Sequence, residues 1–124
     1  MIAVGESAGK GRGIFAQKRI RKGAKIEEAP VVVLPASEVE LLDQLVLQDY
    51  YFLWGEDDDQ AALMFGLCSL CNHSYRPNAI FNLKPENLTI EFVALRDIEA
   101  GEEITINYNG DPDSRKPIWF EALP

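Results

Sequence analysis

The sequence predicts a mostly-β domain built from several small sheets, and two patterns carry that prediction. In the first, Ile-x-x-Gly-x-x-Ile occurs at residues 20–26 and again at 98–104, each time as a charged turn that leads into a strand. Glycine suits such turns because it adopts backbone conformations that other residues resist. The second is a hairpin in which residues 79–83 and 88–95 flank a turn at 85–87. Along its second arm the apolar residues Leu88, Ile90, Phe92 and Ala94 alternate with Thr89 and Glu91, as in a half-buried strand.

The chain is expected to form one domain over residues 1–124. Its length fits a single hydrophobic core, and its content of 47% apolar and 26% charged residues is ordinary for a soluble globular protein. No apolar run approaches the roughly 20 residues that a membrane-spanning helix needs. The N-terminal segment lacks the apolar core of a secretory signal. These observations predict a soluble intracellular protein with no membrane partner.

Upstream of the hairpin, the sequence predicts two strands and a helix. Residues 13–16 and 25–34 are rich in β-branched and aromatic side chains, which favours strands. Residues 37–40 (Ser-Glu-Val-Glu) match a capping box and follow Pro35, so a helix is predicted from there to about Gln48. The residues at helical spacing that should form its buried stripe are Val39, Leu42, Leu45 and Val46.

A strand, a loop and an ambiguous segment separate this helix from the hairpin. Residues 50–54 (Tyr-Tyr-Phe-Leu-Trp) favour a strand. The acidic run at 56–59 is expected to be a solvated loop, because adjacent like charges repel and stay hydrated. Residues 60–71 fit a helix and a strand equally, since their periodicity does not decide between the two.

Charge is unevenly distributed along the chain. The net charge is −8, yet residues 1–25 carry seven lysines and arginines against one acid, so the remainder is strongly acidic. An acidic body argues against general nucleic-acid binding, which needs a basic surface. It suits a basic partner, because complementary charge speeds encounter. Simple solubility accounts for it at least as well.

The two cysteines argue for reduced thiols rather than disulfides. Cys68 and Cys71 are too few for a disulfide framework, which fits an intracellular compartment. With the sole histidine they form Cys68-x-x-Cys71-x-His73, a set of three potential soft ligands. Tetrahedral zinc usually needs a fourth ligand, and the chain has no further Cys or His. No metal site is predicted, although a small metal- or redox-linked protein stays an open alternative.

Four segments carry residues suited to chemistry, and each also has an ordinary structural explanation. The loop at 9–13 (Gly-Lys-Gly-Arg-Gly) would let backbone N–H groups approach a carboxylate or phosphate, yet it matches no dinucleotide or P-loop pattern. His73 lies among the turn-forming residues 72–78. Tyr108 ends a strand, where an aromatic residue usually packs. Residues 119–120 (Trp-Phe) would normally dock against the core.

The order and spacing of three motifs are more specific than any one of them. They are residues 11–16 (Gly-Arg-Gly-Ile-Phe-Ala), 72–78 (Asn-His-Ser-x-x-Pro-Asn) and 101–108 (Gly-Glu-Glu-Ile-Thr-Ile-Asn-Tyr). Together they resemble the SET domain of protein-lysine methyltransferases, in the compact stand-alone form of viral and bacterial members. The resemblance implies a β-clip-like fold of several small curved sheets with one or two short helices. It also implies a C-terminal pseudoknot, in which two crossing segments bring Asn72 and His73 beside Tyr108. It implies a core at about 2–110 and an aromatic lid at 111–124.

By this resemblance the chain would use S-adenosylmethionine as its cofactor. Backbone in the glycine loop would hold the amino-acid part, the Asn-His pair would hold other polar groups and the adenine edge, and the C-terminal aromatics would close over the adenine. His73 would then position the cofactor rather than act as a base. The cofactor-binding residues implied are Gly11, Arg12, Gly13, Asn72, His73, Tyr108, Trp119 and Phe120.

Tyr108 matches the family's catalytic tyrosine. The reaction is the attack of a neutral lysine amine on a methyl group carried by a sulfonium. Because the reference pKa of that amine is about 10.4, the site must favour its neutral form. The resemblance gives Tyr108 the task of aligning the amine with the methyl group. It also implies that Tyr50 and Ile106 line the lysine channel, with Tyr51 in the core, because neighbouring strand residues point to opposite faces.

The chain departs from the family's pattern at several positions. Tyr75 replaces a common cysteine, Ile106 stands where an aromatic residue often tunes the number of methyl groups, and Asn107 replaces a frequent aspartate. The cysteine-rich zinc segments of many nuclear members are not found in this sequence, so no metal is implied. The implied partner is a basic protein or lysine-containing peptide, such as a histone, and the implied location is cytoplasmic, or nuclear for a histone substrate. Two alternatives stay open, namely a homodimer whose partner subunit completes the channel, and a SET fold that binds cofactor or peptide without turnover.

Overall fold

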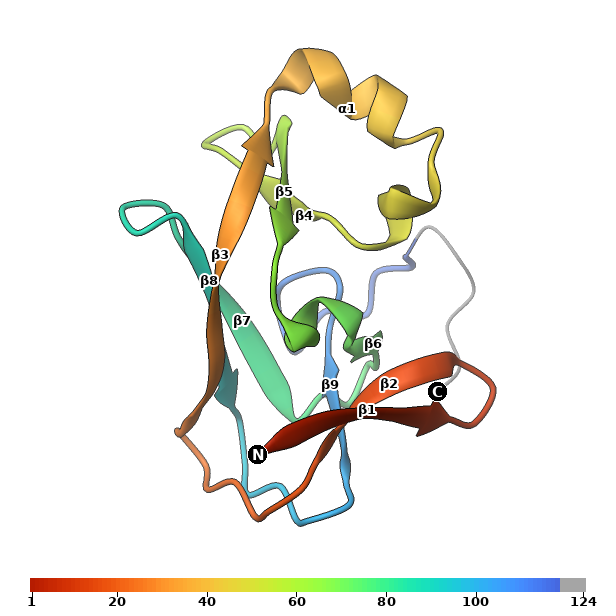
Figure 1. The fold of residues 1–124 in the computed structure, drawn as a ribbon, viewed down its shortest axis with the longest axis vertical. Helices are drawn as coiled ribbons and strands as arrows, with labels where there is room; N and C mark the ends of the chain where they lie inside the picture. Colours follow the sequence, from red (N-terminus) through yellow and green to blue (C-terminus); the bar gives the residue numbers. More distant parts are fainter. Residues whose placement is uncertain (119–124) are drawn as a thin grey trace.

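The computed structural model describes residues 1–118, which fold mainly as β-strands arranged in two sheets (Figure 1). The predicted mostly-β architecture is confirmed. The smaller sheet has the strand order β1-β2-β9-β6, and the larger has the order β4-β5-β3-β8-β7. The elements in chain order are β1 (Ile2–Ser7), β2 (Gly11–Ala16), β3 (Lys25–Leu34), α1 (Ala36–Leu42), the 3-10 turn η1 (Val46–Asp49), β4 (Phe52–Trp54), β5 (Gln60–Met64), the 3-10 turn η2 (Leu67–Leu70), β6 (Asn72–His73), β7 (Ala79–Lys84), β8 (Thr89–Ala94) and β9 (Glu103–Ile106).

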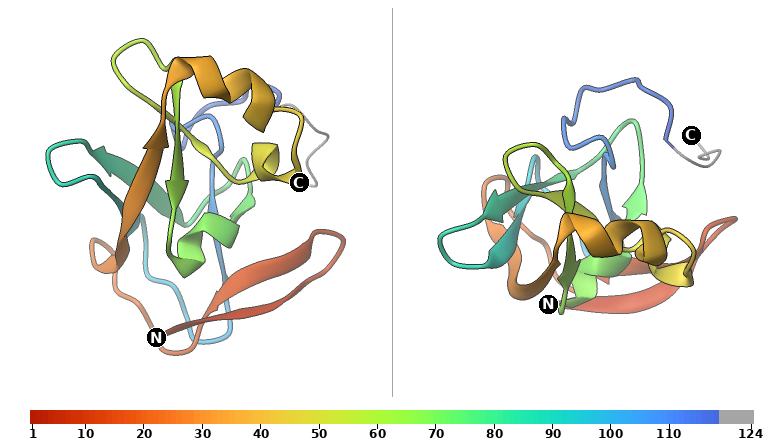
Figure 2. Two further views of the ribbon diagram at one scale, coloured as in Figure 1. Left: turned by 45° about the horizontal axis from the view of Figure 1, so that its top comes forward. Right: turned by 90° about the horizontal axis from the view of Figure 1, so that it is seen from above.

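The long strand β3 organises the larger sheet. Its first half pairs with β8 and its second half with β5, both antiparallel. The β1–β2 and β7–β8 hairpins project to opposite sides of the molecule in both views of Figure 2. One hydrophobic core joins the two sheets. Its fully buried members include Ile14 and Ile104 from the smaller sheet and Ile90 and Phe92 from the larger.

The repeated Ile-x-x-Gly-x-x-Ile pattern forms a pair of turns that bond to each other. Ile20 and Ile98 make an antiparallel bridge, in which each backbone N–H donates to the other's carbonyl at 2.8 and 2.7 Å. Gly23 and Gly101 both adopt a left-handed backbone, with φ of 85° and 87°. The repeated pattern therefore produces two similar turns, and the bridge between them joins the segment before β3 to the segment before β9.

Gly101→Ala is expected to lower the free energy of unfolding by about 1–2 kcal/mol, since an L-residue resists a left-handed backbone. The cost is conformational, because a side-chain carbon at this position would have no heavy atom within 4 Å. Urea denaturation measures it. Gly101→Asn is the matched variant and should cost less, since asparagine tolerates this region. Equal losses in both variants would contradict the conformational explanation.

The predicted helix is shorter than expected, and its capping box does not form. Helix α1 ends at Leu42 rather than near Gln48, and its N-cap is Pro35, with no side-chain capping hydrogen bond. Leu42 is buried, but Leu45 and Val46 are 49% and 77% exposed, so the predicted buried stripe is wrong beyond the first turns. After the helix the chain forms η1, which ends at Asp49 and is followed by Tyr50. Both of these residues line the larger of the two hollows described below.

The strand predictions hold in part. The hairpin is confirmed as β7–β8, although Leu88, expected to alternate inward, lies in the turn with φ of 54° and is exposed. Strand β4 begins at Phe52 rather than Tyr50, and the ambiguous segment 60–71 contains both β5 and η2. Strand β1 was not predicted. Its Gly5 lies against the ring of Phe15, where a side-chain carbon would come within 2.8 Å of that ring.

The segments that the resemblance places together do lie side by side. Strand β6 pairs in parallel with β9, so that Asn72 faces Thr105 and His73 faces Ile106. Asn78, which is 2% exposed, fastens the same crossing. Its amide nitrogen donates to the Glu103 carbonyl at 2.7 Å, and its Oδ1 accepts from Thr105 N–H at 2.9 Å. Among residues 1–118, no helix has the length and apolar character to span a bilayer.

Candidate functional site

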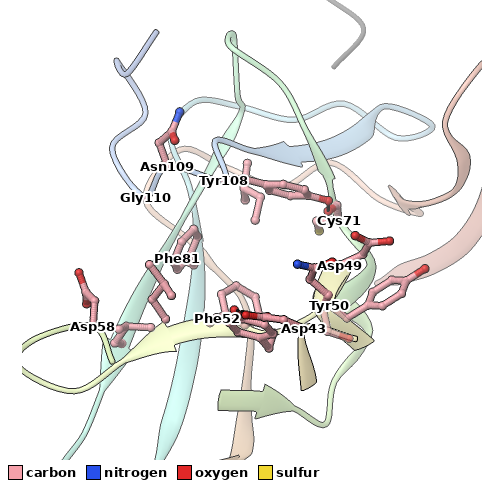
Figure 3. Close-up of a pocket in the computed structure, with 16 residues that line it drawn as sticks. Asp43, Asp49, Tyr50, Phe52, Asp58, Cys71, Phe81, Tyr108, Asn109 and Gly110 are labelled. Atoms are coloured by element: carbon pink, nitrogen blue, oxygen red, sulfur yellow. Dashed lines mark hydrogen bonds between the residues drawn. The ribbon is translucent and has the colours of Figure 1, made fainter. Parts of the chain in front are cut away.

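Two hollows meet at Tyr108. The larger has a volume of about 530 Å³ and lies between β4, β7 and the end of β9. The smaller, of about 330 Å³, lies between the β1–β2 turn and β6. Three residues, Asp49, Tyr50 and Tyr108, line both hollows and form the wall between them. In Figure 3 the Tyr108 ring reaches toward Cys71, with Asp49 and Tyr50 on the same side of the larger hollow.

Tyr108 is fixed at both its backbone and its hydroxyl. It follows directly on β9, and its N–H donates to His73 Nδ1 at 2.9 Å. Its hydroxyl donates to the Cys71 carbonyl at 2.7 Å. Burial, and then the neighbouring Cys71, raises the pKa of this phenol above its ordinary value. Tyr108 therefore stays neutral at physiological pH and can orient a ligand, but it does not serve as an anionic base.

The smaller hollow is lined by part of the predicted glycine loop and by one residue of the Asn-His pair. Gly11, Arg12 and Asn72 reach it, together with Lys10 and Leu70. The Asn72 amide nitrogen donates to the Arg12 carbonyl at 2.9 Å and to Glu103 Oε2 at 2.8 Å. The loop and β6 are thus joined directly to each other behind the hollow.

Two of the predicted cofactor-binding residues, Gly13 and His73, line neither hollow. Gly13 is buried. A side-chain carbon at position 13 would overlap Glu103 Oε2 and lie 2.9 Å from Asn72 Nδ2. The glycine is therefore required by close packing against these two side chains.

His73 is a buried neutral imidazole. The ring is 2% exposed and lies edge to face with Tyr75 and Tyr108, at centroid distances of 4.4 and 5.2 Å. Because Nδ1 accepts a hydrogen bond, the proton must reside on Nε2, which is the only buried side-chain N or O without a partner among residues 1–118. Its backbone carbonyl accepts from Lys10 Nζ at 3.1 Å. Burial, and then the charge of Lys10, lowers the pKa of His73.

His73 is expected to stay neutral in the folded protein at pH values where a free histidine is half protonated. Since its folded pKa lies below the unfolded value of about 6.5, the unfolded chain binds more protons below that pH. This contribution to the free energy of unfolding is therefore present above pH 6.5 and is lost as the pH falls toward the folded pKa. NMR titration of the imidazole checks this directly, because the chain has one histidine. A midpoint at or above 6.5 would contradict it.

The larger hollow has an aromatic lining. Tyr50 and Ile106, the predicted channel residues, both line it. Tyr51 also lines it, so its predicted core position is wrong; its hydroxyl donates to Asp43 at 2.8 Å. Strand β4 begins after Tyr51, so the alternation that placed it inside does not apply. The rings of Phe52 and Phe81 lie 5.1 Å apart in an edge-to-face contact and give the hollow an apolar wall.

The predicted aromatic lid, Trp119 and Phe120, lies outside the described residues. The segment that leads to it is tied to the site. The Lys116 carbonyl accepts hydrogen bonds from the Tyr75 hydroxyl at 3.0 Å and from the Asn109 side-chain amide at 2.7 Å. Tyr75, a departure from the family's usual cysteine, therefore connects the segment after β6 to the C-terminal segment.

Cys68 and Cys71 are free, fully buried thiols. A hydrogen bond between the two side chains, and then burial, raises the pKa of Cys68. Within residues 1–118, no group of three or more His, Cys, Asp and Glu side chains is arranged to hold a metal ion. Both side chains belong to the hydrophobic core, and the Cys71 carbonyl accepts the hydrogen bond from the Tyr108 hydroxyl.

Sequence reasoning missed four residues of the site, Lys10, Asp49, Leu70 and Glu103. Lys10 lies in the glycine loop beside the predicted Gly11 and Arg12, and it lines the smaller hollow. Asp49 directly precedes Tyr50, but the predicted helix was thought to end before it. Glu103 looked like one residue of an alternating strand. Its hydrogen bonds to Ser7 of β1 and Asn72 of β6 follow only from the tertiary structure.

Comparison with known proteins identifies the family. Residues 11–109 match the family described as SET domain. A Schizosaccharomyces pombe protein named histone-lysine N-methyltransferase, H3 lysine-37 specific, is 35% identical over 121 residues, which are 97% of this chain and 77% of that protein. A Saccharomyces cerevisiae histone-lysine N-methyltransferase, H3 lysine-36 specific, is 32% identical, and this chain spans 16% of its length.

Solved structures agree with the sequence matches. A crystallised Plasmodium falciparum protein, described as a candidate histone methyltransferase, is 28% identical with a TM-score of 0.67. The match covers 86% of this chain and 91% of that one. The chain belongs to the SET-domain family of S-adenosylmethionine-dependent protein-lysine methyltransferases.

Proposed function

We propose that this chain methylates a lysine of a basic protein at the wall where its two hollows meet. The observation that carries the proposal is that Tyr108 and Tyr50 line both hollows. A methyl donor in the smaller hollow and a lysine in the larger would therefore approach each other at the Tyr108 hydroxyl. Such an arrangement supplies the alignment that a transfer between two separately bound molecules needs.

The smaller hollow has side chains that suit S-adenosylmethionine. Lys10 and Arg12 provide cations for a carboxylate, and Asn72 provides an amide. Gly11 has φ of 78°, and a side-chain carbon there would have no heavy atom within 4 Å, so its backbone is open to a ligand. The donor set therefore fits an amino-acid group with both charges. When bound, S-adenosylmethionine supplies an electrophilic methyl group on a sulfonium.

The larger hollow suits the stem and amine of a lysine. The rings of Tyr50, Phe52 and Phe81 offer apolar surface to the stem, and a desolvating channel disfavours the charged ammonium. The Tyr108 hydroxyl proton is directed to the Cys71 carbonyl, so the phenol oxygen presents acceptor lone pairs. An acceptor at this point orients an amine N–H and contacts a polarised C–H group. The residues thus align the reaction rather than donate or remove a proton.

A basic substrate is supported by charge. The chain has a net charge of −8, and Asp43, Asp49 and Asp58 line the larger hollow. Complementary charge raises the rate of encounter with a basic protein. Because two relatives carry the names of histone H3 methyltransferases, we propose a histone or histone-like substrate and, with it, action in the nucleus or at intracellular chromatin.

The test is transfer of labelled methyl groups from S-adenosylmethionine to histones and a panel of other basic proteins between pH 7 and 9. Mass spectrometry of the products identifies the lysine and counts its methyl groups. We expect labelling that increases with pH as the amine loses its proton. Binding of cofactor or peptide by calorimetry without any labelling would favour a binding module instead.

A further inference from the structure

Glu103 lies behind the smaller hollow and connects three strands. It is the first residue of β9, and its carboxylate accepts two hydrogen bonds from different strands. The Ser7 hydroxyl at the end of β1 donates to Oε1 at 2.7 Å. The Asn72 amide in β6 donates to Oε2 at 2.8 Å. Glu103 is absent from the lining of both hollows, so it acts on them only through its neighbours.

These bonds determine which end of the Asn72 amide faces the hollow. An ionised carboxylate accepts hydrogen bonds and cannot donate them, so it selects the NH₂ end of the amide. The second N–H donates to the Arg12 carbonyl at 2.9 Å, which is also an acceptor. Both amide hydrogens are thereby used, and Oδ1 has no hydrogen-bond partner among residues 1–118. Oδ1 is also not a buried atom, because within residues 1–118 His73 Nε2 is the one buried side-chain N or O that has no hydrogen-bond partner.

The packing around Glu103 explains why position 13 is glycine. A side-chain carbon there would overlap Glu103 Oε2 and approach Asn72 Nδ2. Strand β2 can therefore lie close enough for the Arg12 carbonyl to reach Asn72 only because Gly13 has no side chain. The glycine, the carboxylate and the amide form one packed unit.

We infer that Glu103 is a positioning residue that holds Asn72 with its Oδ1 toward the ammonium group of the methyl donor. The inference rests on the proposed function, because it places the donor in the smaller hollow. An amide oxygen is an acceptor, and among the two charged groups of the donor's amino-acid part the ammonium is the one that donates. Because the Asn72 amide that Glu103 holds also donates to the Arg12 carbonyl, Glu103 indirectly sets the distance between the glycine loop and β6.

Calorimetry with two ligands tests the inference without turnover. S-adenosylhomocysteine carries the amino-acid part, whereas 5′-methylthioadenosine lacks it. We expect Glu103→Ala to weaken S-adenosylhomocysteine binding about 10-fold or more, as for a lost hydrogen bond to a charged group, and to change methylthioadenosine binding less than 2-fold. Glu103→Gln should recover most of the affinity, because its Oε1 can accept from Asn72 while its Nε2 donates to Ser7 Oγ.

Two further variants make the result decisive. The double variant Glu103→Ala/Asn72→Ala should bind no more weakly than Asn72→Ala, because Glu103 acts through Asn72. Glu91→Ala, which removes a glutamate of β8 that lines neither hollow and pairs with Lys25, should leave both affinities unchanged. Equal losses for both ligands, additive effects of the two substitutions, or a fall in thermal stability with unchanged affinity would overturn the inference. Failure of the wild-type protein to bind either ligand would instead contradict the proposed function.

Discussion

Tyr108→Phe is expected to lower kcat for methyl transfer by about 100-fold or more, with little change in cofactor affinity. The substitution removes the Tyr108 hydroxyl at the wall between the two hollows and leaves the ring in place. Groups that orient or stabilise reacting atoms typically contribute 10²–10⁴ in rate. In the proposed site, the charged part of the cofactor lies against Lys10, Arg12 and Asn72 of the smaller hollow, and the variant leaves these three side chains in place. Single-turnover rates and cofactor affinity by calorimetry give the two quantities separately.

Tyr51→Phe is the matched control for this variant. Tyr51 also lines the larger hollow, but its hydroxyl is bonded to Asp43 and it does not line the smaller one. It should keep kcat within about 3-fold, as expected of a position away from the reacting atoms.

Tyr108→Phe also loses a hydrogen bond to the Cys71 carbonyl, which should cost about 1 kcal/mol of stability. A Tyr108→Phe enzyme with wild-type kcat would contradict the alignment mechanism.

Asn78→Leu is expected to lower the free energy of unfolding by about 3 kcal/mol. The buried amide satisfies Thr105 N–H and the Glu103 carbonyl, and leucine satisfies neither. Each buried backbone group left unpaired costs roughly 1–3 kcal/mol. Urea denaturation monitored by tryptophan fluorescence measures the loss.

Asn82→Leu is the control for the stability of the crossing. Asn82 lies four residues after Asn78, on strand β7, and is exposed. Its amide nitrogen donates a long hydrogen bond to Glu91 Oε1 at 3.4 Å. Its replacement should change the free energy of unfolding by less than about 0.5 kcal/mol, as is usual at the surface. Comparable losses in the two variants would show that Asn78 does not fasten β9 as described.

The sequence predicted well where a short pattern directly determines backbone geometry. The glycine turns at 20–26 and 98–104 and the hairpin at 79–95 are local features, and all three formed as expected. The three family motifs also placed Tyr108 beside His73, although nothing local relates residues 35 positions apart. Spacing and order of motifs carried that long-range information.

Prediction failed where tertiary contacts override local pattern. Helical spacing in residues 37–48 indicated one helix, but the chain turns into η1 after Leu42 to build the wall with Asp49 and Tyr50. Likewise, the family resemblance implies that Gly13 binds the cofactor, but Gly13 lines neither hollow. Its actual neighbours, Glu103 and Asn72, come from strands that no local signal places beside it. The roles of Gly13 and Glu103 follow only from packing.

The parallel pairing of β6 with β9 also bears on how the protein folds. Hydrogen bonds behind the site connect residues far apart in the chain, namely Ser7 with Glu103 and Arg12 with Asn72, and the Ile20–Ile98 bridge spans a similar separation. Pairing of strands far apart in the chain costs loop-closure entropy before the new contacts contribute any favourable free energy, so such topologies fold slowly. During synthesis the earlier strands emerge first and wait for β9, exposing Ile14 and its neighbours until Ile104 covers them. The two hollows can therefore form only once β9 lies between β2 and β6.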